Sequence, residues 1–276
     1  MSTATIAADT LEPATTATFS WRRVFAVVRR QGLVQYRNPG MWFLLFVLPV
    51  VDAVLFASIG VAYGDGTGPV RVLFTGIMLF HLVWQLTLAG SLGFLEEVWS
   101  RNVLNLFTTP LRELEYAVSL LVVGLLRTVV AVGMIAAVGG GLYALDPASA
   151  GWVLVPAAAV LLLFGWAVAL LVVGLTLQYG DSAEVFSWGT LVLLMPLSGV
   201  FYPVEALPGV LQTVARAIPL TRAFDATRIG IEGGSLAVGD LAVAAAGSAV
   251  AVGVAFWFVL RQLRRFREQG WVTRFT

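Results

Sequence analysis

The sequence contains no lysine, no cysteine and a single histidine, His81. A phosphate-binding P-loop needs a lysine after its glycines to reach the β- and γ-phosphates, and Schiff-base catalysis needs a lysine amine. Without cysteine the chain has no disulfide, no thiol nucleophile and no cysteine-based metal site. One histidine cannot build a multi-histidine metal centre. These absences predict a chain that is not an enzyme, binds no metal and holds no nucleotide or other cofactor itself.

Charged residues are also scarce. They make up 12% of the 276 residues, whereas hydrophobic residues make up 59%. Soluble domains carry roughly twice that charged fraction. A soluble protein of this size has no interior large enough to bury so many apolar side chains, so lipid must solvate much of the surface. The composition therefore predicts an all-α integral membrane protein.

Apolar runs long enough to cross a bilayer, which takes about 20 residues, recur along the chain. They cover Met41–Tyr63, Val72–Leu95, Tyr116–Ala144, Trp152–Leu177 and Leu236–Leu260, and a shorter run covers Val185–Val200. We count the short run as a fifth helix that stops early, which makes the last run the sixth. The sequence predicts a six-helix transmembrane domain over residues 41–260.

The segment before these runs has two parts. Residues 1–19 are polar, lack the basic start and apolar run of a signal peptide, and predict a disordered cytosolic tail. Residues 20–37 predict an amphipathic helix in the membrane interface, with its arginines toward headgroups and cytosol. The arginines on one side are Arg22, Arg23, Arg29, Arg30 and Arg37, and the apolar residues opposite are Trp21, Val24, Phe25 and Val28.

Arginines are distributed unevenly among the connecting segments. The N-terminal segment and the basic tail, residues 261–276, carry five each, whereas residues 64–69 and 145–151 carry none. By the positive-inside rule both termini are cytosolic. An even number of spans follows, which agrees with six.

The segment 201–235 breaks this rule, because it is expected outside yet holds Arg216, Arg222 and Arg228. Acidic residues offset them, and the spacings Arg222–Asp225, Asp225–Arg228 and Arg228–Glu232 suit ion pairs on one helical face. The segment is too apolar for a free linker. It predicts an external re-entrant helical hairpin held against protein.

The middle parts of the predicted spans contain Asp52, His81, Gln85 and Arg127. Asp52 and Arg127 each lie about eleven residues into a span, so they share a depth if both helices start at the cytosolic face. A lone charge in lipid is costly, so such groups pair or face water. We expect an Asp52–Arg127 salt bridge with His81 or Gln85 nearby. Whether these groups are structural or line a pathway stays open.

The cytosolic segment 96–112 contains apolar residues where lipid cannot cover them. They are Val103, Leu104, Leu106 and Phe107, preceded by Glu96, Glu97 and Arg101 and ended by Pro110. An exposed apolar patch of this kind marks a partner surface, and the two glutamates are expected to add ion pairs at its rim.

Two stretches resemble the membrane subunits of ABC-2-type transporters, which export drugs, polysaccharides and lipids. Residues 96–111 read EEVWSRNVLNLFTTPL, similar to the family's acidic-basic segment ending in Leu-x-x-(Ser/Thr)-Pro-Leu, although Asn102–Asn105 stand where the family often has Gly-Thr-Leu-Glu. Residues 196–208 read PLSGVFYPVEALP and lead to Ile218-Pro219-Leu220-Thr221. They resemble the fifth-helix exit and external hairpin, on residues Ser198, Gly199, Phe201, Tyr202, Pro203, Arg222, Asp225 and Arg228.

The resemblance implies a permease subunit in the plasma or inner membrane that dimerises with an identical or related chain. Segment 96–112 would be the coupling helix that contacts a separate P-loop ATPase subunit, where ATP and Mg are bound. Aromatic residues would line the pathway: Phe80, Trp84, Trp188, Phe201 and Tyr202. Nothing suggests a nucleic-acid partner. The alternatives are an ion-coupled secondary transporter that uses Asp52, His81 and Arg127, and a non-transporting membrane scaffold.

Overall fold

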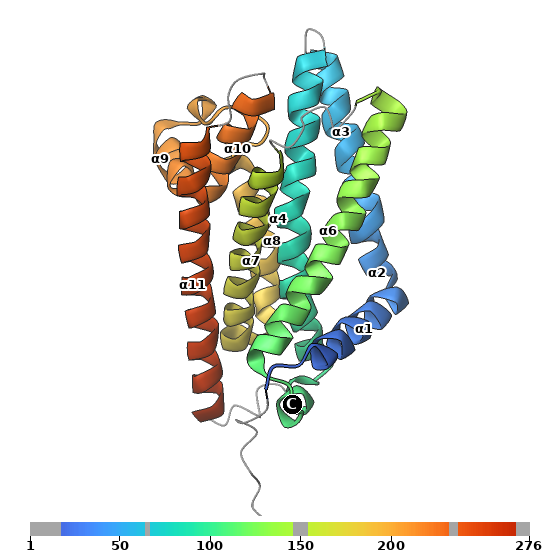
Figure 1. The fold of residues 1–276 in the computed structure, drawn as a ribbon, viewed down its shortest axis with the longest axis vertical. Coiled ribbons are helices and arrows are strands. Elements are labelled where there is room, and N and C mark those ends of the chain that lie inside the picture. Colours follow the sequence, from blue (N-terminus) through green and yellow to red (C-terminus); the bar gives the residue numbers. More distant parts are fainter. Residues whose placement is uncertain (1–17, 64–66, 146–153, 232–236, 269–276) are drawn as a thin grey trace, which may run out of the picture.

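The computed structural model describes residues 18–63, 67–145, 154–231 and 237–268, and all regular structure in these ranges is helical (Figure 1). The expected tail 1–19 falls mostly outside the described residues, as do Glu232 and the last residues of the tail 261–276. The elements are α1 (Trp21–Arg37), α2 (Pro39–Trp42), the π-helix η2 (Phe43–Val47), α3 (Leu48–Tyr63), α4 (Thr67–Trp99), α5 (Val103–Thr108), α6 (Glu113–Tyr143), α7 (Leu154–Tyr179), the 3₁₀ helix η4 (Gly180–Ala183), α8 (Glu184–Leu197), the 3₁₀ helix η5 (Val204–Ala206), α9 (Gly209–Ala217), α10 (Pro219–Ile231) and α11 (Val238–Glu268).

Five helical stretches in the described residues are long and apolar enough to cross a membrane: Pro39–Ala62, Gly68–Trp99, Glu113–Tyr143, Leu154–Tyr179 and Val238–Arg265. They coincide with the five long runs predicted from the sequence. The predicted fifth helix is present as α8, which has 14 residues and falls below spanning length. The basic tail predicted to begin at residue 261 starts as helix, because α11 continues to Glu268.

The centre of the bundle is formed by α4 and α7. Of an 18-residue apolar segment of α4, 83% is buried inside the bundle, and of the corresponding segment of α7, 61%. For the stretch Pro39–Ala62, which includes most of α3, and for α11 the buried share is 22%. Figure 1 shows α11 and α6 on opposite sides of this central pair. The outer helices therefore present apolar side chains outward, as lipid-facing helices do.

Small residues let the central helices approach closely. A Cβ at Gly165 of α7 would lie 3.0 Å from the Val83 Cα of α4, and one at Gly60 of α3 would lie 2.6 Å from the Val70 Cα. Backbone atoms cannot move aside as a flexible side chain does. Glycine is therefore required at position 60, and position 165 leaves little room for a side chain, in keeping with the small residues found where membrane helices pack.

A π-helical turn, η2, joins α2 to α3. A π-turn places one extra residue in a helix and weakens the i→i−4 hydrogen bonding there. The Leu44 carbonyl in this turn accepts a hydrogen bond from Gln85 Nε2 on α4, at 3.2 Å. Gln85 thereby ties the wide turn to the central helix.

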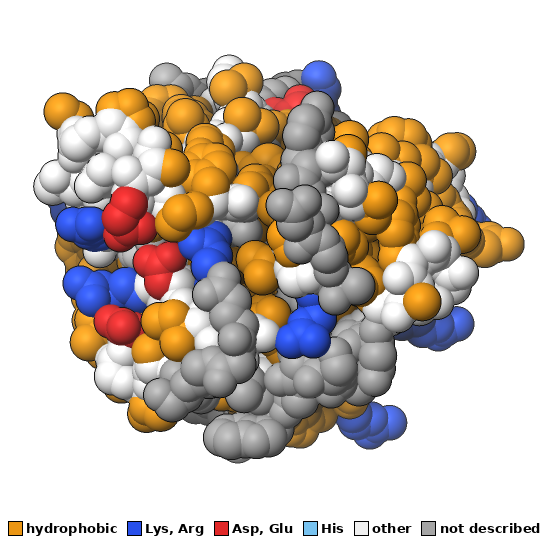
Figure 2. All heavy atoms as spheres, turned by 90° about the horizontal axis from the view of Figure 1, so that it is seen from above, with side chains coloured by type: hydrophobic (Ala, Val, Ile, Leu, Met, Phe, Trp, Pro, Cys, Tyr) orange, Lys and Arg blue, Asp and Glu red, His pale blue; other side chains and the backbone are white. Residues whose placement is uncertain are grey.

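The start of α1 and the end of α11 lie at one end of the bundle, here called the lower end, together with α5 (Figure 1). The helices α9 and α10 lie at the opposite, upper end, where α10 packs against α11, α7 and α4. Seen from above, acidic and basic side chains gather over α9, α10 and the start of α11, and much of the remaining face is hydrophobic (Figure 2).

Ion pairing at the upper end differs in part from the sequence prediction. Arg228 and Asp225 lie 3.9 Å apart, as their spacing suggests. Arg222, however, pairs with Asp240 of α11 at 3.4 Å rather than with Asp225. The reason is that α10 packs along α11, which offers a carboxylate that spacing within α10 does not reveal.

Candidate functional site

The connection from α4 to α6 at the lower end consists of a tight turn and the short helix α5. The turn closes with backbone hydrogen bonds from Arg101 N to Val98 O (2.9 Å) and from Asn102 N to Glu97 O (2.8 Å). Arg101 has φ +53°, a left-handed conformation that costs a non-glycine residue about 1–2 kcal/mol. The surrounding contacts must hold this turn in place, because the residue does not favour it.

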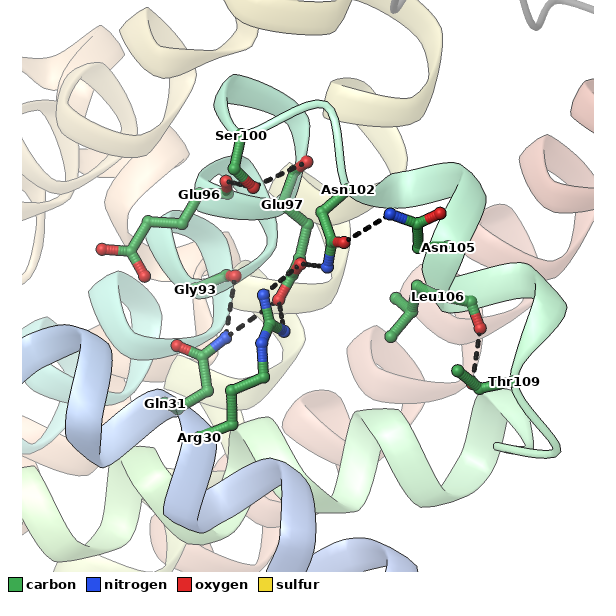
Figure 3. A network of polar contacts seen from close by, with 10 residues as sticks. All are labelled: Arg30, Gln31, Gly93, Glu96, Glu97, Ser100, Asn102, Asn105, Leu106 and Thr109. Carbon is green, nitrogen blue, oxygen red and sulfur yellow. Dashed lines mark hydrogen bonds and ion pairs between the residues drawn. The ribbon is translucent and has the colours of Figure 1, made fainter.

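Glu97 is the central acceptor of these contacts (Figure 3). Its carboxylate accepts two hydrogen bonds from the Arg30 guanidinium of α1 and one from Asn102 Nδ2 at 2.7 Å. Gln31 donates to the Gly93 carbonyl at 3.2 Å. The Glu97 side chain is 1% exposed, whereas that of Arg30 is 42% exposed. The hydrogen bonds of Glu97 link α1, the end of α4 and the start of α5.

Glu115, in the first turn of α6, forms a second such centre. It accepts hydrogen bonds from Arg23 Nε (2.7 Å), Arg23 Nη2 (2.6 Å) and the Ser20 amide (2.8 Å). It also accepts from the Arg112 amide at 3.0 Å, which caps α6. The Glu115 side chain is fully buried. The two carboxylates thus fix α1 to both helices that α5 connects.

Two sequence predictions are corrected by this arrangement. Glu97 does not lie at the rim of an exposed surface, because it is buried against Arg30, and Oε1 of Glu96 is buried without a hydrogen-bond partner. Arg23 and Arg30 each bind a buried carboxylate, so they do not point only toward headgroups and cytosol. Their hydrogen bonds to Glu115 and Glu97 raise the pKa of both guanidinium groups above the ordinary arginine value, so they remain charged.

A groove of about 340 Å³ separates α1 from α5. Ala26, Val27 and the two paired arginines line it from α1, and Asn102, Asn105, Leu106, Thr109, Pro110 and Leu111 line it from the other side. Thr109 and Pro110 are exposed at its edge. The predicted partner-contact residues Leu104 and Phe107 belong to α5, but their side chains lie outside the described residues.

The four polar residues inside the spans are only partly brought together. His81 Nε2 lies 3.1 Å from Asp52 Oδ2, so the predicted closeness of these two is found. The predicted Asp52–Arg127 salt bridge is wrong. Arg127 is buried on α6, with Nε and Nη2 unpaired. A shared depth gives no information on which way each side chain points.

The predicted hairpin residues form a compact turn after α8. Ser198 Oγ donates to the Met195 carbonyl at 2.8 Å. Gly199 has a φ angle of +68°, and its carbonyl accepts a hydrogen bond from Arg228. Tyr202 donates to the Pro196 carbonyl at 2.8 Å. The next residue, Pro203, is extended and exposed, and it leads into η5.

The same turn contacts α3, and Asp225 of α10, which lies close to Gly199, has a perturbed carboxyl group. The Phe201 ring stacks on Phe56 of α3, with centroids 4.0 Å apart. Burial raises the pKa of the Asp225 carboxyl, and Arg228 offsets this only in part.

Sequence reasoning missed Glu115, Gln31 and Asn102, which complete the lower-end network. Glu115 occupies the third helical position that a capping box assigns to glutamate, but Arg112 replaces the expected Ser or Thr at the N-cap. That partial match was the available signal. No comparable pattern marks Gln31 or Asn102, whose roles depend on how α1 packs.

The contacts of this site join helices to one another. Within the described ranges, no group of three His, Asp or Glu residues is placed to hold a metal ion. The buried carboxylates are neutralised by arginines and serve to fasten helices. Both helices that flank α5 are therefore fastened to α1.

Apolar helices of spanning length, with a fastened connecting helix at one end, define an α-helical membrane protein whose connecting helix is coupled to its spans. The family model for the ABC-2 type transporter matches residues 22–231. The chain therefore belongs to the ABC-2 type transporter family, as its two motifs predicted, and is a component of a membrane transporter. No curated protein matches the chain.

Proposed function

We propose that the chain is the permease subunit of an ATP-driven exporter, and that α5 is the coupling helix on which a separate P-loop ATPase subunit acts. The observation that carries this is the fastening of α5: buried Glu97 and Glu115 tie its two flanking helices to α1. Closure of the ATPase on ATP would move α5, and the ion pairs would pass this motion to the central helix α4. ATP and Mg belong to the partner.

A second copy of the chain is proposed to cover the exposed face of α3. Asp52 lies in the middle of a span with its side chain 22% exposed, and lipid does not solvate a carboxylate. Val51 and Leu55 beside it are about half exposed. This face therefore meets protein or water, as it would at a dimer seam that contains the pathway.

The topology that fits this function has the lower end in the cytosol of the plasma or inner membrane. The arginines of α1 and of the last turns of α11 lie at that end, consistent with the positive-inside rule. Completion of six spans requires α8, with the turn after it, to cross a thinned or protein-lined part of the bilayer. The hairpin of α9 and α10 would then lie in the outer leaflet.

Co-purification in mild detergent with the P-loop ATPases of the source cell tests the proposal. The wild type should retain a stoichiometric ATPase, and Phe107→Asp should lose it. Val210→Asp makes the same apolar-to-acid change on α9, at the upper end, where the side chain is 79% exposed. It should keep the ATPase. A chain that purifies without any ATPase and moves solute without ATP contradicts the proposal.

The Asp52–His81 pair gives a specific reason to test a second candidate, the ion-coupled transporter. A carboxylate–imidazole pair inside a span is the kind of group that carries protons in such transporters. That function requires transport in vesicles that follows an imposed proton gradient without ATP and that stops in His81→Gln. Transport that needs ATP and survives this change excludes it.

A further inference from the structure

An apolar groove opens between α6 and α11 in the lower half of the bundle. Its volume is about 110 Å³. It is lined by Ala117 and Leu120 of α6, by Trp166, Leu170, Val173 and Leu177 of α7, and by Phe256, Val259, Leu260 and Leu263 of α11. All three helices are apolar enough to span a membrane, so the groove faces the hydrocarbon rather than water.

The depth of the groove places it in one leaflet. Its lining on α6 runs from Arg112, at the helix N-cap, to Leu120, a rise of about 12 Å. On α11 the lining runs from Phe256 to Leu263, and the exposed Arg264 and Arg265 follow it directly. Arginines at the end of a span lie at the headgroup level of a membrane. The groove therefore starts at the lower headgroup level and extends into the acyl region.

The charges at its mouth favour an anion. Arg112 lines the groove, and Arg264 lies one turn beyond Leu260 on the face of α11 that lines it. Arg261 and Arg265 are also exposed on these last turns, against the single acid Glu113 in the lining. An anionic lipid headgroup matches this balance, since it places its phosphate among arginines.

The groove also reaches the connection between α4 and α6. Leu106 of α5 and Leu111 after it line this groove, and the same two residues line the groove between α1 and α5. One pair of leucines therefore separates a lipid-facing cavity from the cavity beside the proposed ATPase contact.

We propose that this groove binds one acyl chain of an anionic phospholipid from the lower leaflet, with the headgroup at Arg112 and Arg264. The bound chain packs against Leu106 and Leu111 and so supports α5 from the membrane side. The support of α5 matters for coupling to the ATPase and so rests on the proposed function. The lipid site itself does not rest on it.

Photo-crosslinking in reconstituted vesicles tests the site without any ATPase. The probe is phosphatidylglycerol with a diazirine in its acyl chain, and the labelled residues are mapped by mass spectrometry. Leu170, Val173 and Leu177 are each less than 8% exposed, so lipid surrounding the bundle does not reach them. Labelling there is expected, in addition to labelling of exposed Leu126 and Val129.

Filling the groove provides the matched comparison. Ala117→Trp, and the smaller Ala117→Leu, should lower labelling of the three α7 residues several-fold and leave labelling of Leu126 and Val129 unchanged. Ala137→Trp, on an exposed position of the same helix, should change neither. Phosphatidylcholine carrying the same diazirine should label the α7 residues several-fold less.

Three results overturn the proposal. The first is the absence of α7 labelling in the wild type, a result that stands even if the filled variants fail to fold. The second is equal labelling by phosphatidylcholine, which removes the headgroup assignment. The third is α7 labelling that a transported solute displaces completely, which makes the groove a cargo site. A wild-type chain that purifies without any ATPase and moves solute without ATP would contradict the proposed function but leave this result intact.

Discussion

Glu97 shows how much of the lower end depends on one carboxylate. Replacing it by glutamine keeps its volume but leaves Arg30 without a counter-charge. Hydrogen bonds to charged groups contribute about 1.5–3 kcal/mol, and the exposure of Arg30 reduces this. We expect Glu97→Gln to destabilise the protein by about 1–2 kcal/mol, seen as a drop of several degrees in apparent Tm.

The neighbouring carboxylate is a matched control for that measurement. Oε1 of Glu96 is buried without a hydrogen-bond partner, so Glu96→Gln removes no comparable ion pair and should change the apparent Tm less. An equal or larger loss in Glu96→Gln would show that Glu96 and Arg127, rather than Glu97 and Arg30, fasten this end.

Residue-level predictions from the sequence succeeded for depth and failed for direction. The spacing from the helix ends placed Asp52, His81 and Arg127 inside the spans, but Asp52 lies against His81, and Nε and Nη2 of Arg127 are unpaired. Likewise, the helical wheel separated arginines from apolar residues on α1 without revealing that Arg23 and Arg30 meet buried acids. These partners come from other helices, and spacing along the chain does not encode how helices are turned toward one another.

At the scale of elements, α1 is held to α6 through Glu115. Glu115→Ala removes the acceptor for Arg23 and for the Ser20 amide. The amides of α1 should then exchange hydrogen faster, while those of α7 keep their protection, because α1 separates locally from the bundle. Hydrogen exchange followed by mass spectrometry measures this. Glu184→Ala, which removes the acid in the first turn of α8, should leave α1 unchanged, and unchanged α1 exchange in Glu115→Ala would contradict the prediction.

The helix α10 offers a pH-dependent prediction. Burial raises the pKa of Asp225, so the folded protein binds this proton more tightly than the unfolded chain does. Ionised Asp225 therefore destabilises the fold at neutral pH, and that cost fades as the pH falls through the raised pKa toward the ordinary aspartate value of about 4. Asp225→Asn should raise the apparent Tm at pH 7.5, and its advantage over the wild type should shrink as the pH approaches 4.

Asp240→Asn is the comparison for Asp225. Its carboxylate pairs with Arg222 at 3.4 Å on the surface, and exposed pairs contribute at most about 1 kcal/mol. Asp240→Asn should therefore not raise the apparent Tm at pH 7.5. If the wild type and Asp225→Asn had the same apparent Tm at every pH, the prediction would be wrong, and Arg228 would fully compensate the buried charge of Asp225.

Whole elements were the most predictable level of the structure. Long apolar runs define helices because each must satisfy its own backbone hydrogen bonds in lipid, and the five runs reappear within a few residues of their predicted ends. The short apolar run Val185–Val200 likewise reappears as α8, but the turn at Gly199 and the split of the hairpin into α9 and α10 at Ile218 depend on local backbone conformation. Their details were outside the reach of hydropathy.

At the scale of the whole molecule, the exposed face of α3 predicts how two copies meet. The chain has no cysteine, so a single introduced thiol is unique. Leu55→Cys, at a position 50% exposed, should be joined to its counterpart in a second copy by a short bis-maleimide in native membranes. Val254→Cys on α11, 58% exposed, should stay monomeric on denaturing gels. Crosslinking through α11 alone would place the seam on the opposite side.

The π-turn at Phe43–Val47 sets how the preceding helix, α2, is rotated about the axis of α3. One residue more in a helix rotates the preceding segment by about 100° around the axis and moves it about 1.5 Å along it. The inserted residue thus affects the direction in which α2 leaves α3, and the extended Asn38 (φ −108°, ψ 103°) then sets the direction of α1. One added residue in the π-turn therefore contributes to placing α1 against the bundle rather than away from it.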